Sequence, residues 1–263
     1  MPYPRLKCGM EGLFIVAGIL VIGVFVLLAQ MQAQRAERRR TEFSNLVAQH
    51  GMRYFPAGFS DVAPGGFWQQ LLADWRSTDA GRFLCRFEGF EPFGTGNRPK
   101  AVNICYGIIN LIEWTLFDYS YTVTRSNGKT TSTVTYSFGV VAARIDYRLP
   151  SLTLGRESFM TRLFGAKDMN FEVEEFNQRY HVQTDDPAHS SQVINPAMIE
   201  YLLSLPVLSW QLTGNQILIA LNSEQEPSKL FQIREVIEGF LHRVPDFVRD
   251  DRKLVGVSLE SPF

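Results

Sequence analysis

The chain has 263 residues, of which 45% are hydrophobic and 13% aromatic, and its 26 Lys and Arg nearly balance 27 Asp and Glu. This apolar content excludes an acidic disordered chain, and a net charge of −1 argues against a nucleic-acid-binding protein. Three cysteines are too few for a disulfide scaffold, and their spacing matches no zinc site. The length predicts one large domain or two small ones.

An apolar segment follows a short N-terminal flank, residues 1–11. Residues 12–29 are eighteen consecutive uncharged residues rich in Ile, Leu, Val and Phe. As a helix they would extend about 27 Å, close to the thickness of a bilayer core. The segment lacks the polar stripe of a soluble helix, and no small-residue cleavage site follows it. It therefore predicts a transmembrane helix through which the chain contacts the lipid bilayer.

A basic cluster follows this segment at the predicted membrane edge. Its members are Arg35, Arg38, Arg39 and Arg40. Only Arg5 and Lys7 lie on the other side, so the positive-inside rule places the N-terminus outside the plasma membrane and the C-terminal domain in the cytoplasm. Residues 1–40 carry a net charge of +4 and residues 41–263 carry −5. We therefore interpret the cluster as a topology signal rather than a specific lipid site.

Residues 30–50 contain neither Pro nor Gly and are predicted to form a basic juxtamembrane helix. Its last turns carry a stripe at helical spacing, and Gly51 is a candidate left-handed cap. The stripe consists of Phe43, Leu46, Val47 and His50. We expect this stripe to pack against a soluble domain at residues 51–248. That domain is expected to begin with a short strand at 52–55, a loop at 56–66 and a helix at 67–76.

In the next part of the sequence, apolar and polar residues alternate with a period of two, which predicts a meander of antiparallel strands. The expected strands surround Phe83, Cys85 and Phe87 and then cover 101–108, 112–124, 131–147 and 151–154, with a tight turn at Asn110. Residues 91–100 are rich in Pro and Gly and are expected to form a loop.

Asn127-Gly128 suits a two-residue type I′ turn between two of these strands. Such a turn would pair Tyr119 with Tyr136, and it would place the aromatic and aliphatic residues of the hairpin on one face. The corresponding neighbours are Phe117 with Phe138 and Tyr121 with Val134. Beyond Val140 the apolar residues of the strand move to the alternate positions, Val141, Ala143 and Ile145. This change predicts either a β-bulge near Gly139 or burial of both faces.

The last third of the sequence is predicted to contain both strands and helices. Strands are expected at 170–173 and 180–184 around an acidic turn, and at 208–212 and 216–221 as a hairpin across Thr213-Gly214-Asn215. Asp186-Pro187 and Asn195-Pro196 each predict a capped helix. An amphipathic stripe from Leu230 to Leu241 predicts a helix that Pro245 ends, before a tail at 249–263.

No residues form a convincing catalytic, cofactor-binding or metal-binding set. Gly128-Lys129-Thr130 lacks the first glycine of a phosphate loop, and no two histidines have the H-E-x-x-H spacing. Two facing carboxylates among Glu172, Glu174 and Glu175 would allow acid–base chemistry, but clustered acids near a strand end are more often a solvated edge or partners for Arg, which is the interpretation we favour. Cys85 and Cys105 are expected to be core thiols in a reducing cytoplasm, or a disulfide in an extracytoplasmic domain.

Several segments together resemble a family of uncharacterised bacterial single-pass membrane proteins. The most specific of them is Phe171-Glu172-x-Glu174-Glu175-Phe176-Asn177-x-Arg179. The others are Phe117-Asp118-Tyr119-Ser120-Tyr121, Leu149-Pro150-Ser151-Leu152, Asn195-Pro196-x-Met198 and Arg243-Val244-Pro245. The resemblance implies an N-terminal membrane helix and a cytoplasmic domain of about this size, and it supplies no catalytic residue, cofactor or ligand.

The fold class expected is α+β: a transmembrane helix, then a mainly antiparallel, curled or barrel-like sheet with a packed C-terminal helix. The function expected is a membrane-anchored, non-enzymatic module that binds a protein or lipid partner at the inner membrane surface. Two alternatives remain open. One is a membrane-anchored hydrolase that uses the 172–179 region, and the other is an extracytoplasmic anchored domain.

Overall fold

The computed structural model describes residues 8–60, 79–128, 130–156 and 167–254. The predicted helix at 67–76 lies outside these residues. The chain divides into two compact units, Met1–Glu42 and Phe43–Phe263. Helix α1 (Cys8–Gln49) forms the first unit and contributes its last turns to the second.

Helix α1 confirms that residues 30–49 are helical. Across the described part of the chain, we find no helix with an apolar stretch long enough to cross a membrane. The predicted membrane segment at 12–29 includes residues 12–19 and Val21, whose side chains lie outside the described set. The transmembrane helix therefore stays a sequence-based prediction.

The last turns of α1 belong to the core of the second unit, as the helical stripe predicts. Phe43 is fully buried and Val47 is 5% exposed, while His50 stacks on Phe231 with ring centroids 4.9 Å apart. Gly51 ends the helix with a φ of +63°, in the left-handed conformation expected of a glycine cap. The short strand β1 (Arg53–Phe55) then begins, as predicted.

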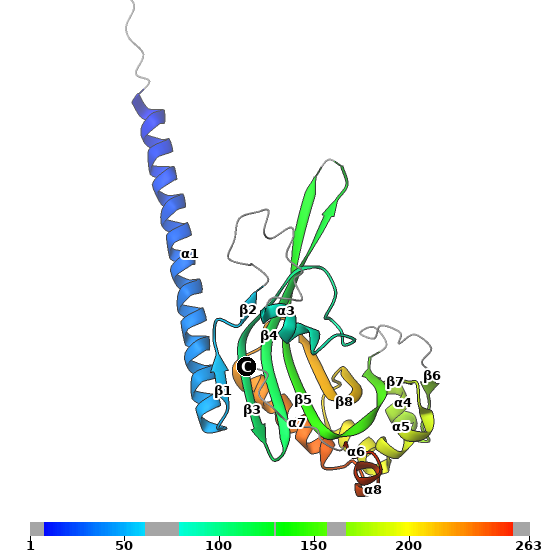
Figure 1. Cartoon of the computed structure of the whole chain (residues 1–263). Helices are drawn as coiled ribbons and strands as arrows, with labels where there is room; N and C mark the ends of the chain where they lie inside the picture. The colour runs from blue at the N-terminus through cyan, green and yellow to red at the C-terminus, as the bar shows by residue number, and fades with distance from the viewer. Residues whose placement is uncertain (1–7, 61–78, 129, 157–166, 255–263) are drawn as a thin grey trace, which may run out of the picture. The chain divides into compact units, whose positions relative to one another are not determined.

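The second unit is built on one antiparallel sheet of eight strands that does not close into a barrel. The order is β1-β3-β4-β5-β7-β6, with β2 beside β3 and β8 beside β5 (Figure 1). The remaining strands are β2 (Phe59–Ser60), β3 (Asn97–Ile109), β4 (Ile112–Ser126), β5 (Thr131–Gly155), β6 (Lys167–Met169), β7 (His181–Thr184) and β8 (Trp210–Asn222). The α+β class and the antiparallel sheet are thus confirmed, and the barrel-like closure is wrong.

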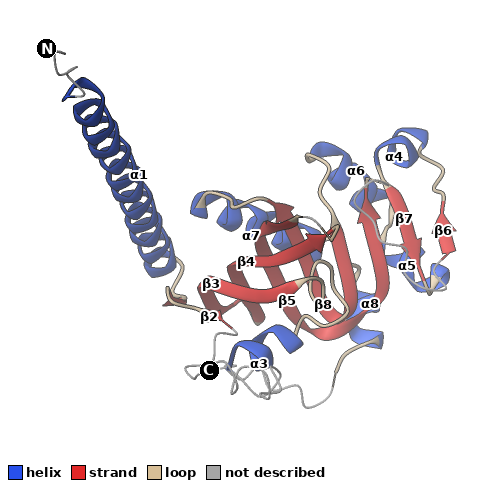
Figure 2. Cartoon of the chain, turned by 90° about the horizontal axis from the view of Figure 1, so that it is seen from above, coloured by secondary structure: helices blue, strands red, loops and turns tan. Residues whose placement is uncertain are grey.

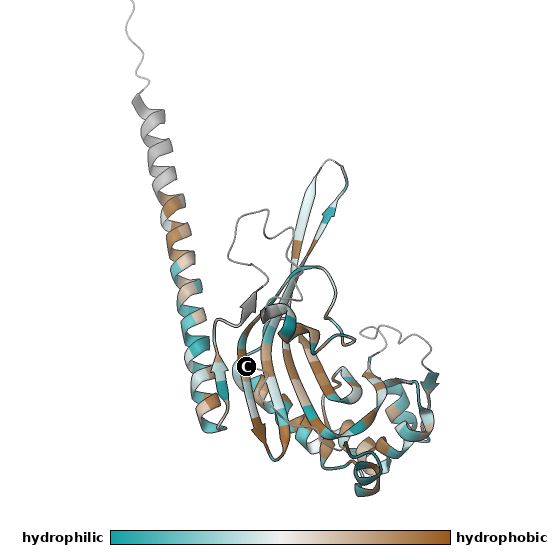
Figure 3. Ribbon diagram, in the orientation of Figure 1, coloured by the Kyte–Doolittle hydropathy of each residue, from teal (hydrophilic) through white to brown (hydrophobic). Residues whose placement is uncertain are grey.

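Helices cover both faces of the sheet (Figure 2). One face carries Trp114, Val141 and Ile217 and packs against the long helix α7 (Pro227–Leu241). The other carries Phe117 and Val140 and packs against the short helix α3 (Asp79–Cys85). The remaining helices are α4 (Glu174–Arg179), α5 (Pro187–Val193), α6 (Pro196–Ser204) and α8 (Asp246–Asp251). Figure 3 shows how apolar residues concentrate along the central strands.

The change of apolar phase in β5 reflects burial of both faces. Val140, Val141, Ala142 and Ala143 are all at most 5% exposed, and β4 pairs with β5 from Glu113 to Ser126 without a register shift. No bulge therefore forms at Gly139. The second of the two predicted explanations is confirmed, because each face has its own helical cover.

The predicted register of the β4–β5 hairpin is wrong by two residues. Tyr121 pairs with Tyr136 and Tyr119 with Phe138, because the connection is a four-residue loop. The Asn127 side chain accepts hydrogen bonds from the backbone and hydroxyl of Thr130, and Asn127 does not adopt the positive φ that a type I′ turn requires. A register shift of two residues leaves every side chain on the same face of the sheet, so the predicted separation of apolar and hydroxyl faces is retained.

Several other expected elements differ from the structure, among them the separate strands expected at 131–147 and 151–154, which form one continuous strand, β5. Residues 79–85 form helix α3 instead of a strand, because their apolar side chains follow a helical spacing. The expected hairpin across Thr213-Gly214-Asn215 is one continuous strand, β8, in which Gly214 has a φ of +61° at an irregular step of the pairing with β5. Residues 170–173 precede α4 and form no strand, whereas β6 lies at 167–169.

Candidate binding pocket

The segment that covers one face of the sheet is α3 and the turns that follow it, residues 79–96; we call it the cover segment. Phe83, Leu84, Phe87 and Phe90 recur on one side of it and are all at most 5% exposed. Phe83 and Phe87 each lie 5.2 Å from Phe117 of β4 between ring centroids. Aromatic contacts of this geometry stabilise packing beyond the area they bury, so the cover segment is held by an aromatic cluster.

Polar contacts fix the end of the cover segment. The Gln211 side chain accepts a hydrogen bond from the backbone N–H of Glu91 at 2.7 Å and donates one to its carbonyl at 2.8 Å. The hydroxyl of Thr95 donates to the Pro92 carbonyl at 2.7 Å. Gly96 has a φ of +72°, and a Cβ there would lie 2.3 Å from the Tyr121 ring. Only glycine allows the chain to approach β4 so closely.

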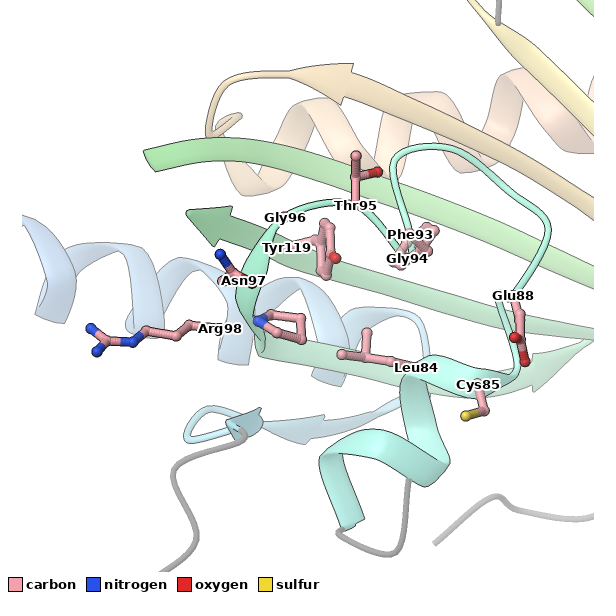
Figure 4. A pocket seen from close by; sticks show the side chains of 11 residues that line it. Leu84, Cys85, Glu88, Phe93, Gly94, Thr95, Gly96, Asn97, Arg98 and Tyr119 are labelled. Carbon is pink, nitrogen blue, oxygen red and sulfur yellow. The ribbon is translucent and has the colours of Figure 1, made fainter. Parts of the chain in front are cut away.

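A cavity of about 510 Å³ lies between the cover segment, the start of β3 and β4 (Figure 4). Phe93 lies against Tyr119, with ring centroids 4.5 Å apart, and Leu84 adds an aliphatic wall. Glu88 and Arg98 lie at opposite ends in Figure 4, and both are exposed. The remaining lining residues are Cys85, Gly94, Thr95, Gly96, Asn97 and Pro99. The pocket thus combines an apolar floor with one acidic and one basic group.

A buried charge cluster ties the cover segment to the sheet elsewhere on the same face. Glu113 is 1% exposed; it pairs with Arg86, which directly follows α3, and with Arg144, whose Nε lies 3.2 Å from its Oε2. Backbone pairing sets Glu113, Arg144 and Gln216 side by side on β4, β5 and β8. Burial and the negative charge of Glu113 raise the pKa of Tyr106. The space among these groups is about 10 Å³, too small for an organic ligand.

The structure places the acidic residues of the 172–179 region on an exposed edge. Glu172, Glu174 and Glu175 are all exposed, and Arg179 donates to the carbonyls of Leu203 and Leu205 at 2.6 and 2.7 Å. A cavity of about 680 Å³ nearby is lined by Arg156, Asn177, Gln178, Arg179, His181, Pro206 and Val207. No carboxylate is among the described residues that line it, so the facing pair that acid–base hydrolysis needs is not found among them.

The other sequence candidates are dispersed. In the predicted membrane-edge cluster, Arg35, Arg38 and Arg40 are exposed on α1 and Arg39 is half-buried. Cys105 is buried and Cys85 half-buried, and both are free thiols. Among the described residues, no three His, Cys, Asp or Glu side chains group closely enough to hold a metal ion.

Sequence reasoning missed the pocket because it took the period-two spacing of Phe83, Cys85 and Phe87 as a strand. The spacing of Phe83, Leu84, Phe87 and Phe90, at i, i+1, i+4 and i+7, carries the helical signal that would have identified the cover segment. Gly94 and Gly96 belong to the loop that the sequence predicts at 91–100, and both line the pocket.

Comparison with known proteins gives no family for the chain. No protein-family model matches it, and no curated protein matches it. Among solved structures, it is similar to the crystal structure of the mycobacterial trehalose monomycolate transport factor A, TtfA. The two are 12% identical, and the match covers 79% of this chain and 96% of that one with a TM-score of 0.49. A superposition this loose does not establish a shared fold or function.

Proposed function

We propose that the chain is a non-enzymatic binding module that takes an apolar group of a lipid or protein partner into the pocket under the cover segment. The observation that carries this proposal is the cavity of about 510 Å³ with a floor of Phe93, Tyr119 and Leu84. Its volume lies within the range of about 300–1,000 Å³ that is typical of small-molecule sites, which are mostly apolar with a few placed polar groups.

The lining residues favour an amphiphilic ligand. An acyl or aromatic group would lie against the floor, whereas a polar head would meet Glu88 or Arg98 at the ends of the pocket. A hydrolase is less well supported, because among the described lining residues Glu88 is the one carboxylate and none is a histidine. Acid–base hydrolysis normally needs a second titratable group within hydrogen-bond reach.

Cys85 provides a direct test, because its half-buried thiol lines the pocket. The full chain with Cys8→Ser is reconstituted in nanodiscs, and the rate at which a maleimide modifies Cys85 is measured with increasing oleate. Occupancy of the pocket is expected to slow the modification, because access to the thiolate controls its reactivity. Phe93→Ala should weaken this protection, whereas Phe247→Ala, at a 55% exposed site of α8 outside the pocket lining, should leave it unchanged. Unaltered modification at saturating oleate would contradict a lipid ligand.

We also propose that residues 12–29 anchor this module in the plasma membrane with its C-terminal domain in the cytoplasm. The support is the apolar sequence of the segment and the basic cluster from Arg35 to Arg40. Reporter fusions after residue 60 should be active only as cytoplasmic reporters. Strong alkaline phosphatase activity would reverse the topology and favour the extracytoplasmic alternative, in which Cys85 and Cys105 meet oxidising conditions.

A further inference from the structure

The β4–β5 hairpin extends beyond the rest of the sheet. Strand β3 pairs with β4 only as far as Thr122, and β8 pairs with β5 only from Gly139 onward. Residues 123–134 therefore form a two-stranded ribbon, which we call the hairpin extension; Figure 1 shows it projecting past the neighbouring strands. A two-stranded ribbon alone is marginally stable in water, which suggests a surface that supports it.

The hairpin extension and its base are amphipathic. One face continues the aromatic cluster of the sheet: Tyr121 stacks on Tyr136 with ring centroids 5.3 Å apart, and Val123 pairs with Val134. Tyr136 is 39% exposed and Val134 is 45% exposed. The opposite face carries only hydroxyl side chains, namely Thr122, Thr124, Ser126, Thr131, Thr133 and Thr135.

Three basic side chains lie on the hairpin extension and at its base. Arg125 lies on the hairpin extension, and Arg98 and Lys100 lie at its base, where Asn97 pairs with Thr122 and Lys100 with Ser120. All three are exposed, and within the described part of the chain none takes part in an ion pair. Neither residues 92–112 nor 119–145 contain Asp or Glu. Burial raises the pKa of the Tyr121 phenol, and the neighbouring Tyr136 and the charge of Glu91 raise it further.

We propose that the hairpin extension lays its apolar face on the surface of an anionic phospholipid bilayer. Tyr136 would lie at the headgroup level, where tyrosine is enriched, with Val134 beside it, and Arg98, Lys100 and Arg125 would meet the lipid phosphates. The hydroxyl face would remain in water. Basic side chains beside an exposed tyrosine complement the phosphates and the interface of an anionic bilayer, so we commit to a lipid surface. This inference does not depend on the pocket, which oleate protection of Cys85 tests separately.

The test compares the two faces of the hairpin extension in the full chain. Ser132→Cys places a fluorophore on the apolar face, and Thr133→Cys places it on the hydroxyl face one residue away. Both carry Cys8→Ser and Cys85→Ser and are reconstituted in vesicles that contain doxyl-labelled lipid, either with phosphatidylglycerol or with phosphatidylcholine alone. We expect strong quenching at residue 132, weak quenching at residue 133, and loss of the difference in uncharged vesicles.

Charge reversal separates a lipid surface from other partners. Arg98→Glu with Lys100→Glu and Arg125→Glu should reduce quenching at residue 132 to the level in uncharged vesicles, with about fivefold weaker association per basic residue lost. Arg148→Glu, at an exposed position elsewhere on β5, should have no such effect. Equal quenching of the two faces would overturn the proposal, and so would quenching that ignores lipid charge. No quenching with either lipid would assign the apolar face to a protein partner instead.

Discussion

At the scale of single residues, Gly96 sets how closely the pocket loop approaches the sheet. A Cβ at this position would lie 2.3 Å from Tyr121 Cδ2 and 2.8 Å from the Thr122 carbonyl oxygen, at a φ of +72°. Gly96→Ala is therefore expected to lower the free energy of unfolding by about 2 kcal/mol or more, through the steric clash and backbone strain together. Denaturant titration of the reconstituted chain measures the change.

Gly94 is a matched control, because its φ is +77° and nothing lies within 4 Å of a Cβ there. Gly94→Ala should cost only about 1 kcal/mol, the penalty of the left-handed conformation alone. Equal costs at the two positions would contradict the close approach of the loop to β4.

The buried carboxylate of Glu113 is expected to contribute more than any exposed one. Glu113→Gln would leave Arg86 and Arg144 without their shared counter-charge at a site that is 1% exposed, at a cost of about 3 kcal/mol. Glu175→Gln removes a pair at 3.9 Å in which the glutamate is 69% exposed, and should change the free energy of unfolding by less than about 0.5 kcal/mol. Thermal unfolding of both variants tests the contrast.

His189 links stability to pH. Burial lowers the pKa of its imidazole, the charge of Arg252 lowers it further, and Asp186 opposes both. The unfolded chain therefore binds a proton at a higher pH than the folded chain, so this contribution to stability is complete above about pH 6.5 and decreases as the pH falls below that value. His189→Gln should flatten the dependence between pH 7 and 5.

At the scale of elements, the local signals that the sequence carries in adjacent residues predict the structure well. Asp186 and Asn195 precede prolines and cap α5 and α6, and their side chains accept from the backbone N–H groups of His189 and Met198. Asn195→Ala is expected to cost about 1 kcal/mol, the usual value of such a cap. A change in thermal midpoint that Asn195→Asp restores would identify the cap as the cause.

Structural features that depend on residues far apart in the sequence are predicted less well. Gly214 looks like a turn in the sequence, yet β5 continues alongside β8 and keeps both halves of it in one strand. The hairpin register depends on whether Asn127 bonds Thr130, which the dipeptide Asn127-Gly128 does not reveal. The pocket floor also depends on distant partners, because it joins Phe93 to Tyr119, which lie 26 residues apart in the sequence.

At the scale of the whole molecule, the sheet has two sides with different roles. One face of β4 and β5 packs under α7 and the C-terminal helices, where Trp114 and Trp210 are fully buried. Among the described residues, the segment 79–96 covers the other face, and beyond it the apolar face of the hairpin is partly exposed. The pocket and the apolar face of the hairpin thus lie on the same face of the sheet, where a ligand or surface can add to the burial.

The second unit begins within α1 rather than after it, which predicts how the chain tolerates truncation. Phe43 and Val47 are buried in the same cluster as Trp114 and Phe231. A chain that begins at residue 30 retains them and should unfold at nearly the temperature of the full chain. A chain that begins at residue 51 loses both, and removal of a buried phenylalanine side chain alone costs about 3–5 kcal/mol. Phe43→Ala in the full chain should reproduce much of this loss in thermal unfolding followed by circular dichroism. Equal midpoints for the two truncated chains would show that the end of α1 does not stabilise the sheet.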